Sequence, residues 1–168
     1  MAETEQIFLS DEILTFMRNA ARLAGELKEP FITTRTLLVA LLEEPTLGEA
    51  LVEVLPREKL ENYELPEDAG TRLTASRVQE PNAVAGERPA LLRFNTLAFK
   101  TPDGAKSVWL SREAFQVWNE AAKRVRDGEK LMPKHIAFGI AADAIRSPGV
   151  LAAMHISPGD VTEVLLKL

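Results

Sequence analysis

Cysteine is absent from the 168 residues, and histidine occurs only twice. The absence of cysteine excludes disulfide scaffolds, cysteine nucleophiles and thiolate zinc sites, and it is consistent with a reducing cytoplasm. Basic residues are also few, because 20 Lys and Arg stand against 25 Asp and Glu, for a net charge of −5. This balance disfavours a nucleic-acid partner and offers no polybasic segment for an anionic membrane.

Long hydrophobic runs are missing as well. The longest stretch without a charge, residues 147–159, has 13 residues and is interrupted by proline and glycine, whereas a bilayer span needs about 20. The first five residues, Met1-Ala2-Glu3-Thr4-Glu5, are acidic where a signal peptide is basic. We therefore expect a cytoplasmic protein with no membrane partner.

Motifs for catalysis are lacking too. The sequence contains no G-x-x-x-x-G-K-[ST] phosphate loop and no G-x-S-x-G nucleophile motif. The two histidines, His135 and His155, are twenty residues apart and neither belongs to an H-x-x-x-H pair. We expect no enzyme activity, no ATP binding, no cofactor and no metal site.

What is present is helical periodicity in the two outer thirds. Ser10 is a good N-cap with acidic residues directly after it, and apolar residues then recur at three- and four-residue steps as far as Pro30. Thr33 or Thr34 can cap a second helix that ends at Pro45. Two shorter helices are expected around residues 47–54 and 57–62.

The middle of the chain has a different character. Residues 64–88 show no sustained apolar period and are expected to form an extended connector. Two apolar segments follow, separated by Thr101-Pro102-Asp103-Gly104, a sequence that strongly favours a turn. This pattern predicts a small β-hairpin at about residues 91–110 that packs on the helical body.

The last third of the chain repeats the pattern of the first. Phe8-Leu9-Ser10-Asp11-Glu12 corresponds to Trp109-Leu110-Ser111-Arg112-Glu113 at an offset of 101. A two-residue deletion then shifts the offset to 99, where Thr36-Leu37-Leu38-Val39 aligns with His135-Ile136-Ala137-Phe138. The offset of 101 returns at Gly48 and Gly149. Apolar positions fall on apolar positions throughout, which indicates an internal duplication of about 55 residues.

This duplicated pattern resembles the N-terminal domain of Clp unfoldases. The resemblance is carried by the alanine-rich stretches Ala20-Ala21-Arg22 and Ala121-Ala122-Lys123 and by residues 32–42, which sit on the family's Thr-Glu-His-Leu-Leu segment. It covers about residues 7–62 and 108–168. It implies a mainly α fold of two pseudo-twofold-related four-helix repeats with an inserted linker and hairpin between them.

The expected organisation is therefore one domain in three parts. Residues 1–62 form repeat one, residues 63–108 form the insert and residues 109–168 form repeat two. The insert is longer than the short linker usual in the family, and no ATPase module is present in the sequence.

The family's Thr-Glu-His triplet is replaced by other residues in both repeats. Repeat one has Thr34-Arg35-Thr36 and repeat two has Pro133-Lys134-His135. In some family members the glutamate helps to hold phosphoarginine, and a basic residue offers a guanidinium no acceptor. We therefore expect weak or absent phosphoarginine binding. The candidate peptide- or anion-binding residues, which we expect to favour acidic or C-terminal carboxylate peptides, are Thr34, Arg35, Thr36, Lys134 and His135. A second interpretation is that both bases are merely solvated.

The resemblance implies a non-catalytic module that binds proteins or peptides in the Clp unfoldase–protease system. Its partners would be a Clp ATPase or protease ring, adaptor proteins or substrate polypeptides. Two alternatives remain open. One is a structural or dimerisation module that uses the strand edge of the hairpin. The other is an enzyme or small-molecule binder with a pocket between the repeats.

Overall fold

Repeat one forms its helices where the sequence predicts them. In the computed structural model the described residues are 6–63, 77–79, 92–93, 96–126, 128–146 and 149–168. Helix α1 (Asp11–Glu26) is capped by Ser10, whose Oγ accepts a hydrogen bond from the Ile13 amide at 3.0 Å. The helices that follow are α2 (Thr34–Glu43), α3 (Pro45–Leu51) and α4 (Arg57–Asn62).

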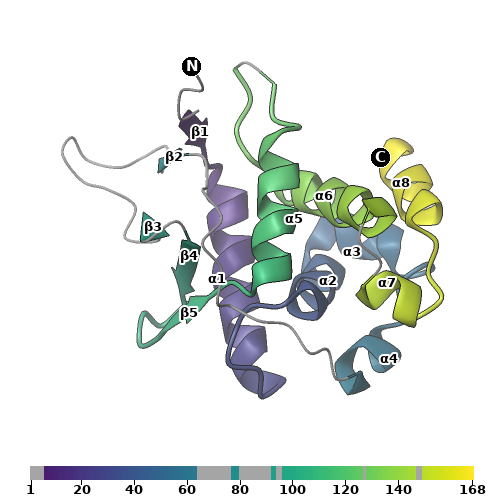
Figure 1. The fold of residues 1–168 in the computed structure, drawn as a ribbon, viewed down its shortest axis with the longest axis horizontal. Coiled ribbons are helices and arrows are strands. Elements are labelled where there is room, and N and C mark those ends of the chain that lie inside the picture. Colours follow the sequence, from purple (N-terminus) through teal and green to yellow (C-terminus); the bar gives the residue numbers. More distant parts are fainter. Residues whose placement is uncertain (1–5, 64–76, 80–91, 94–95, 127, 147–148) are drawn as a thin grey trace.

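Repeat two has the same order of helices. Helix α5 (Arg112–Ala122) is capped by Ser111, whose Oγ accepts from the Ala114 amide at 3.1 Å. It is followed by α6 (Pro133–Arg146), α7 (Val150–Ala153) and α8 (Pro158–Leu166). The predicted mainly α fold of two four-helix repeats is confirmed for the described residues (Figure 1).

A pair of equivalent backbone bridges relates the two repeats. The Ser10 amide donates to the Leu131 carbonyl at 3.2 Å, and the Ser111 amide donates to the Ile32 carbonyl at 2.9 Å. Ser10 aligns with Ser111 at the offset of 101, and Ile32 aligns with Leu131 at the offset of 99. Exchanging the two repeats therefore converts one bridge into the other. This exchange is what a pseudo-twofold relation requires, and it ties the start of each repeat's first helix to the segment before the second helix of the other.

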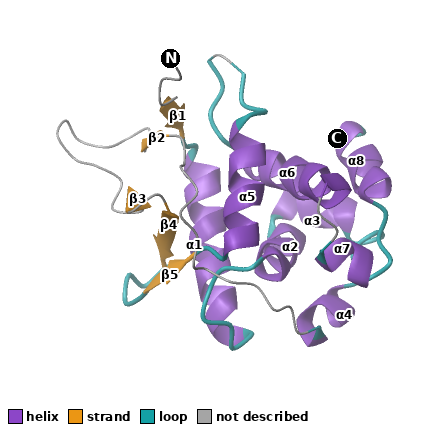
Figure 2. Ribbon diagram, viewed as in Figure 1, coloured by secondary structure: helices purple, strands orange, loops and turns teal. Residues whose placement is uncertain are grey.

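The strands lie on one side of the helical body (Figure 2). Strands β4 (Thr96–Lys100) and β5 (Ser107–Trp109) form the predicted hairpin, and β3 (Leu92–Arg93) pairs with the outer edge of β4. Strand β1 (Gln6–Phe8) pairs in parallel with β2 (Arg77–Gln79), which the sequence did not predict. The predicted connector, residues 64–88, otherwise lies outside the described residues.

The hairpin is part of the core. Phe99 on β4 is 1% exposed, and its ring lies 5.4 Å from the ring of Trp118 on α5. Strands β4 and β5 both contact α1, while α2 contacts α5 and α6 from the other repeat. A single hydrophobic cluster thus joins both repeats and the hairpin. The exact division at residues 62 and 108 stays a prediction.

Candidate functional site

The start of α2 holds three of the five predicted site residues around a carboxylate of the same chain. The Thr33 Oγ1 and Thr36 Oγ1 form a capping box, and Thr36 Oγ1 also donates to the Glu29 carboxylate at 2.8 Å. The Glu29 side chain is 8% exposed. Glu29 therefore occupies the position at the helix N-terminus where an external anion would be favoured.

Arg35 is buried beside this carboxylate. Its side chain is 6% exposed, forms an ion pair with Glu29 and donates from Nη1 to the carbonyls of Glu61 and Tyr63, at 3.2 Å for Glu61. A buried guanidinium needs such partners, because an unpaired buried charge is costly. Arg35 thus connects the start of α2 to the end of α4, and its charge is already balanced within the chain.

The start of α6 has a different arrangement. The His135 Nδ1 accepts a hydrogen bond from the Met132 amide at 2.9 Å, which is the role that Thr36 has in repeat one. Burial lowers the pKa of His135, and the neighbouring charge of Lys134 lowers it further. His135 is 4% exposed, whereas Lys134 is exposed. Of the five predicted residues, Lys134 is therefore the one whose charge is presented to solvent.

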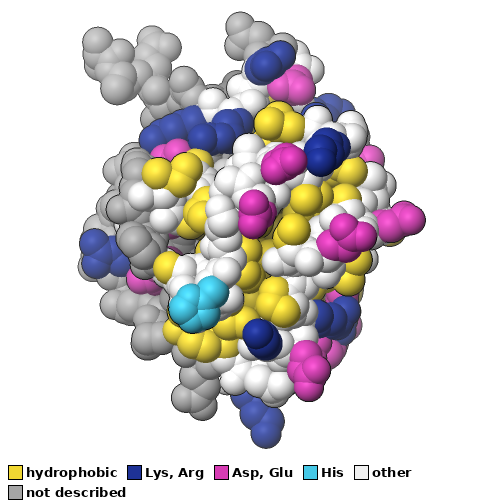
Figure 3. Space-filling model, turned by 90° about the vertical axis from the view of Figure 1, so that its right-hand side faces the viewer, with side chains coloured by type: hydrophobic (Ala, Val, Ile, Leu, Met, Phe, Trp, Pro, Cys, Tyr) yellow, Lys and Arg dark blue, Asp and Glu magenta, His cyan; other side chains and the backbone are white. Residues whose placement is uncertain are grey.

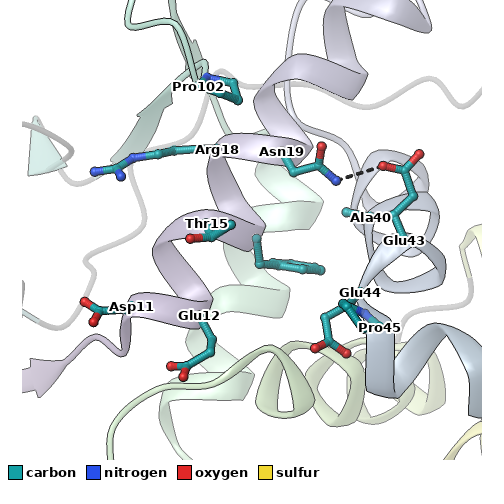
Figure 4. A pocket seen from close by; sticks show the side chains of 11 residues that line it. Asp11, Glu12, Thr15, Arg18, Asn19, Ala40, Glu43, Glu44, Pro45 and Pro102 are labelled. Atoms are coloured by element: carbon teal, nitrogen blue, oxygen red, sulfur yellow. Dashed lines mark hydrogen bonds between the residues drawn. The ribbon is translucent and has the colours of Figure 1, made fainter.

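An open groove lies elsewhere in repeat one, between α1, α2 and the start of α3. It has a volume of about 800 Å³ and is lined by Asp11, Glu12, Thr15, Phe16, Arg18, Asn19, Ala40, Glu43, Glu44, Pro45 and Pro102. Pro102 comes from the turn of the β4–β5 hairpin, so the insert forms one wall (Figure 4). The buried residues Phe16 and Ala40 give the groove an apolar floor.

One end of the groove is closed by a polar network. The Glu43 carboxylate accepts from Asn19 Nδ2 at 3.0 Å, from Arg22 at 2.9 Å and from Arg57 at 2.7 Å. Partial burial alone would raise the pKa of Glu43, but the hydrogen bonds from Asn19 and Arg57 and the charges of both arginines lower it overall. Glu43 is thus ionised and satisfied, and it holds α1, α2 and α4 together.

The other end carries two carboxylates with acceptor capacity to spare. Glu12 is exposed on the first turn of α1, and no hydrogen bond or ion pair is recorded for it among the described residues. Glu44 caps α3 by accepting from the Leu47 amide through Oε2, at 2.6 Å, so its Oε1 is not used by the cap. In the close view Glu12 and Glu44 lie at the same end of the groove, on opposite sides, while Arg18 extends away from α2 (Figure 4).

Repeat two differs at the positions that correspond to the floor. Ala40 aligns with Gly139, and a Cβ placed on Gly139 would meet the Val117 carbonyl oxygen at 2.7 Å and the Ala121 amide nitrogen at 3.0 Å. The absence of a side chain therefore lets α6 lie directly against α5. In repeat one the matching residue, Ala40, carries a Cβ and lines the groove together with Phe16.

Sequence reasoning missed the groove because no short motif encodes it. Its residues come from α1, α2, the α2–α3 junction and the hairpin turn, which are brought together only by folding. One signal was available in the sequence. Ala40 aligns with Gly139, so only repeat one has an apolar side chain at this position, whereas the neighbouring aligned positions are apolar in both repeats. Glu29 was also missed, although it lies four residues before the cap Thr33.

Large hydrophobic side chains are also exposed outside the groove. They include Val52 at the end of α3 and Leu166 and Leu168 at the C-terminal end. On the face seen in Figure 3, hydrophobic side chains run between charged side chains of both signs. This face therefore shows no excess of charge of one sign.

Among the residues that the structure describes, no helix is long and apolar enough to cross a bilayer. Within the same residues, no three His, Asp or Glu side chains are grouped as a metal site would require.

Among solved structures, 13 chains are similar to this one. The chain is similar to the N-terminal domain of the caseinolytic protease associated chaperone ClpD from Arabidopsis thaliana, with a TM-score of 0.48 and 15% sequence identity over 95% of this chain and 92% of that chain. We draw no conclusion about function from a likeness at this level. No protein-family model matches the sequence, and no curated protein matches it.

Proposed function

We propose that this protein is a non-catalytic module that binds polypeptides within the Clp unfoldase–protease system, as an adaptor, a substrate receptor or a regulator of a Clp ring. The observation that carries the proposal is the apolar-floored groove of about 800 Å³ on a duplicated helical body. Its volume is within the range of roughly 300–1,000 Å³ that is typical of ligand sites. The assignment to the Clp system depends on the resemblance of the duplicated sequence pattern to the Clp N-terminal domain.

The test uses purified Clp components. The protein is mixed with Clp ATPase rings and with the protease ring of the same organism, and association is measured by analytical ultracentrifugation. We expect it to co-sediment with a ring or to change the rate at which the assembled protease degrades an unfolded substrate. The absence of both effects contradicts the proposal, and a self-associating species that ignores the rings supports the dimerisation alternative instead.

The start of α6 is a second contact that we propose for acidic peptides. Of the residues predicted for this role, Arg35 and Thr36 contact Glu29 and Thr34 lies between them and the cap of α2, whereas Lys134 is exposed in the first turn of α6. We therefore expect Lys134→Glu to weaken binding of a peptide with a C-terminal carboxylate. The same peptide should bind Lys59→Glu, which changes a lysine of α4, as tightly as the unaltered protein. Equal binding by all three proteins contradicts this contact.

A further inference from the structure

The groove of repeat one has the chemistry of a site for one kind of peptide. Its floor is apolar at Phe16 and Ala40, and Pro45 and Pro102 stand at its sides. Phe16 and Ala40 are only 4% and 1% exposed, so the apolar surface that remains for a partner to cover belongs to the exposed Pro45 and Pro102. The groove can thus accept an apolar side chain of a partner against one of these prolines.

The charge at its rim is negative. Four carboxylates line the groove against one arginine, and that arginine, Arg18, extends away from α2 (Figure 4). Glu43 is satisfied by Asn19, Arg22 and Arg57 and is therefore a poor partner for an incoming cation. The Glu12 carboxylate and the Glu44 Oε1 atom remain, and they flank the same end. A cation there would find acceptors on both sides.

We propose that this groove docks a basic polypeptide segment, in which an apolar side chain packs against the exposed Pro45 while an adjacent Arg or Lys lies between Glu12 and Glu44. Arginine suits the position best, because its planar donors can serve two acceptors at once. This inference rests on the proposed function and adds to it the chemical class of the bound segment. It also predicts that repeat one alone carries the site, since Gly139 brings α6 against α5 in repeat two.

The test compares three fluorescein-labelled peptides of the same length by fluorescence anisotropy. They carry the cores Arg-Leu-Arg, Ser-Leu-Ser and Glu-Leu-Glu in an otherwise identical neutral sequence. We expect saturable binding of the basic peptide, weaker binding of the neutral one and a steep loss of affinity with added salt, because exposed charges are screened.

Variants then locate the site. Glu12→Lys and Thr15→Lys each place a cation at the groove, and we expect each to raise the Kd of the basic peptide by about five- to tenfold. Gln116→Lys, at the position of repeat two that matches Thr15, adds the same charge outside the groove and should leave the Kd unchanged. Thermal unfolding of each variant verifies that it is folded.

The outcomes separate this inference from the proposed function. Equal weakening by Thr15→Lys and Gln116→Lys shows a net-charge effect and overturns the inference. Groove-dependent binding of the neutral or acidic peptide with equal affinity overturns the basic preference, while peptide binding itself stands. If a Clp ring associates but no basic peptide binds, the inference is wrong and the proposed function survives. If neither a ring nor any peptide binds, both are wrong.

Discussion

At the scale of single residues, the aligned pair Arg35 and Lys134 shows how one sequence position acquires two roles. Arg35 is buried against Glu29 and two backbone carbonyls, whereas Lys134 is exposed. In repeat two the carboxylate that precedes the second helix, Glu129, is exposed and accepts from the Arg126 amide at 3.0 Å. Both basic residues lie in the first turn of their helix. The presence of a buried carboxylate partner, and not the position in the helix, therefore decides whether the basic side chain stabilises the fold.

Replacing Arg35 should expose this difference directly. Arg35→Met leaves the Glu29 carboxylate buried without its cation, and breaking a buried pair in this way costs about 3–5 kcal/mol of unfolding free energy. Lys134→Met, the matched change in repeat two, should stay within about 0.5 kcal/mol of the unaltered protein. Urea unfolding measures both values, and equal losses would show that Arg35 is as dispensable as Lys134.

His135 makes the stability of the protein depend on pH. Its pKa is lowered by burial and by the charge of Lys134, and the charge of Glu129 opposes the shift. The folded protein therefore resists protonation that the unfolded chain accepts below a pKa of about 6.5. The stability is therefore complete above that pH and is lost as the pH falls below it, through the lower pKa of the folded state.

The variant His135→Thr tests this, because Thr36 already fills the equivalent capping position in repeat one. Unfolding free energies are measured in urea at pH 8 and at pH 5.5 for both proteins. We expect the unaltered protein to lose more stability between the two pH values than the variant does. An identical loss in both proteins would assign the pH dependence to other groups.

At the scale of elements, the hairpin is held by Phe99. Its ring is 1% exposed and lies 5.4 Å from Trp118, at an interplanar angle of 49°. Truncation of a buried phenylalanine typically costs about 3–5 kcal/mol, so Phe99→Ala should destabilise the whole body. Phe8→Ala is the matched control, because Phe8 is 44% exposed, and its effect should be several-fold smaller. Similar melting temperatures for the two variants would mean that the insert is not part of the core.

The contact of α5 with α6 gives a second prediction at this scale. A methyl group at Gly139 would meet backbone atoms of α5, which cannot move aside as a side chain can. Gly139→Ala should therefore cost about 1–3 kcal/mol through overpacking. Gly25→Ala in α1 meets nothing within 4 Å and should instead be neutral or stabilising by up to about 1 kcal/mol. Thermal unfolding of the pair checks both signs, and a stabilised Gly139→Ala would contradict the close approach.

Helices and turns could be predicted from the sequence because local chemistry determines them. Ser10 and Ser111 cap their helices as expected, and α4 spans the predicted residues 57–62. The hairpin turn also forms as its Pro-Asp-Gly sequence indicates, with Gly104 at a φ of 75°. These features depend on residues that are close in sequence.

The groove and the partner of Arg35 could not be predicted, because both depend on distances between elements. The groove is lined by residues of α1, α2, the start of α3 and the hairpin turn, and Glu29 reaches Arg35 only after the chain has turned between the helices. The acidic-peptide contact near Arg35 stays a prediction, and the Glu29 carboxylate at this helix start could not be read from the sequence.

At the scale of the whole molecule, the duplication provides an internal control. The two repeats exchange equivalent backbone bridges and share one core, yet the groove lies on repeat one. A binding partner should therefore distinguish two halves that have the same order of helices. Because the two repeats differ in this way, showing which repeat a partner binds is as informative as measuring its affinity.

The central claim is that the groove of repeat one binds a polypeptide, and amide chemical-shift mapping by NMR tests it most directly. The ¹⁵N-labelled protein is titrated with the Arg-Leu-Arg peptide. The account predicts saturable shifts at Glu12, Thr15, Asn19 and Glu44, with little change at the matching positions of repeat two, Glu113, Gln116, Glu120 and Asp143. Shifts of equal size in both repeats, or none around the groove at saturating peptide, would contradict it.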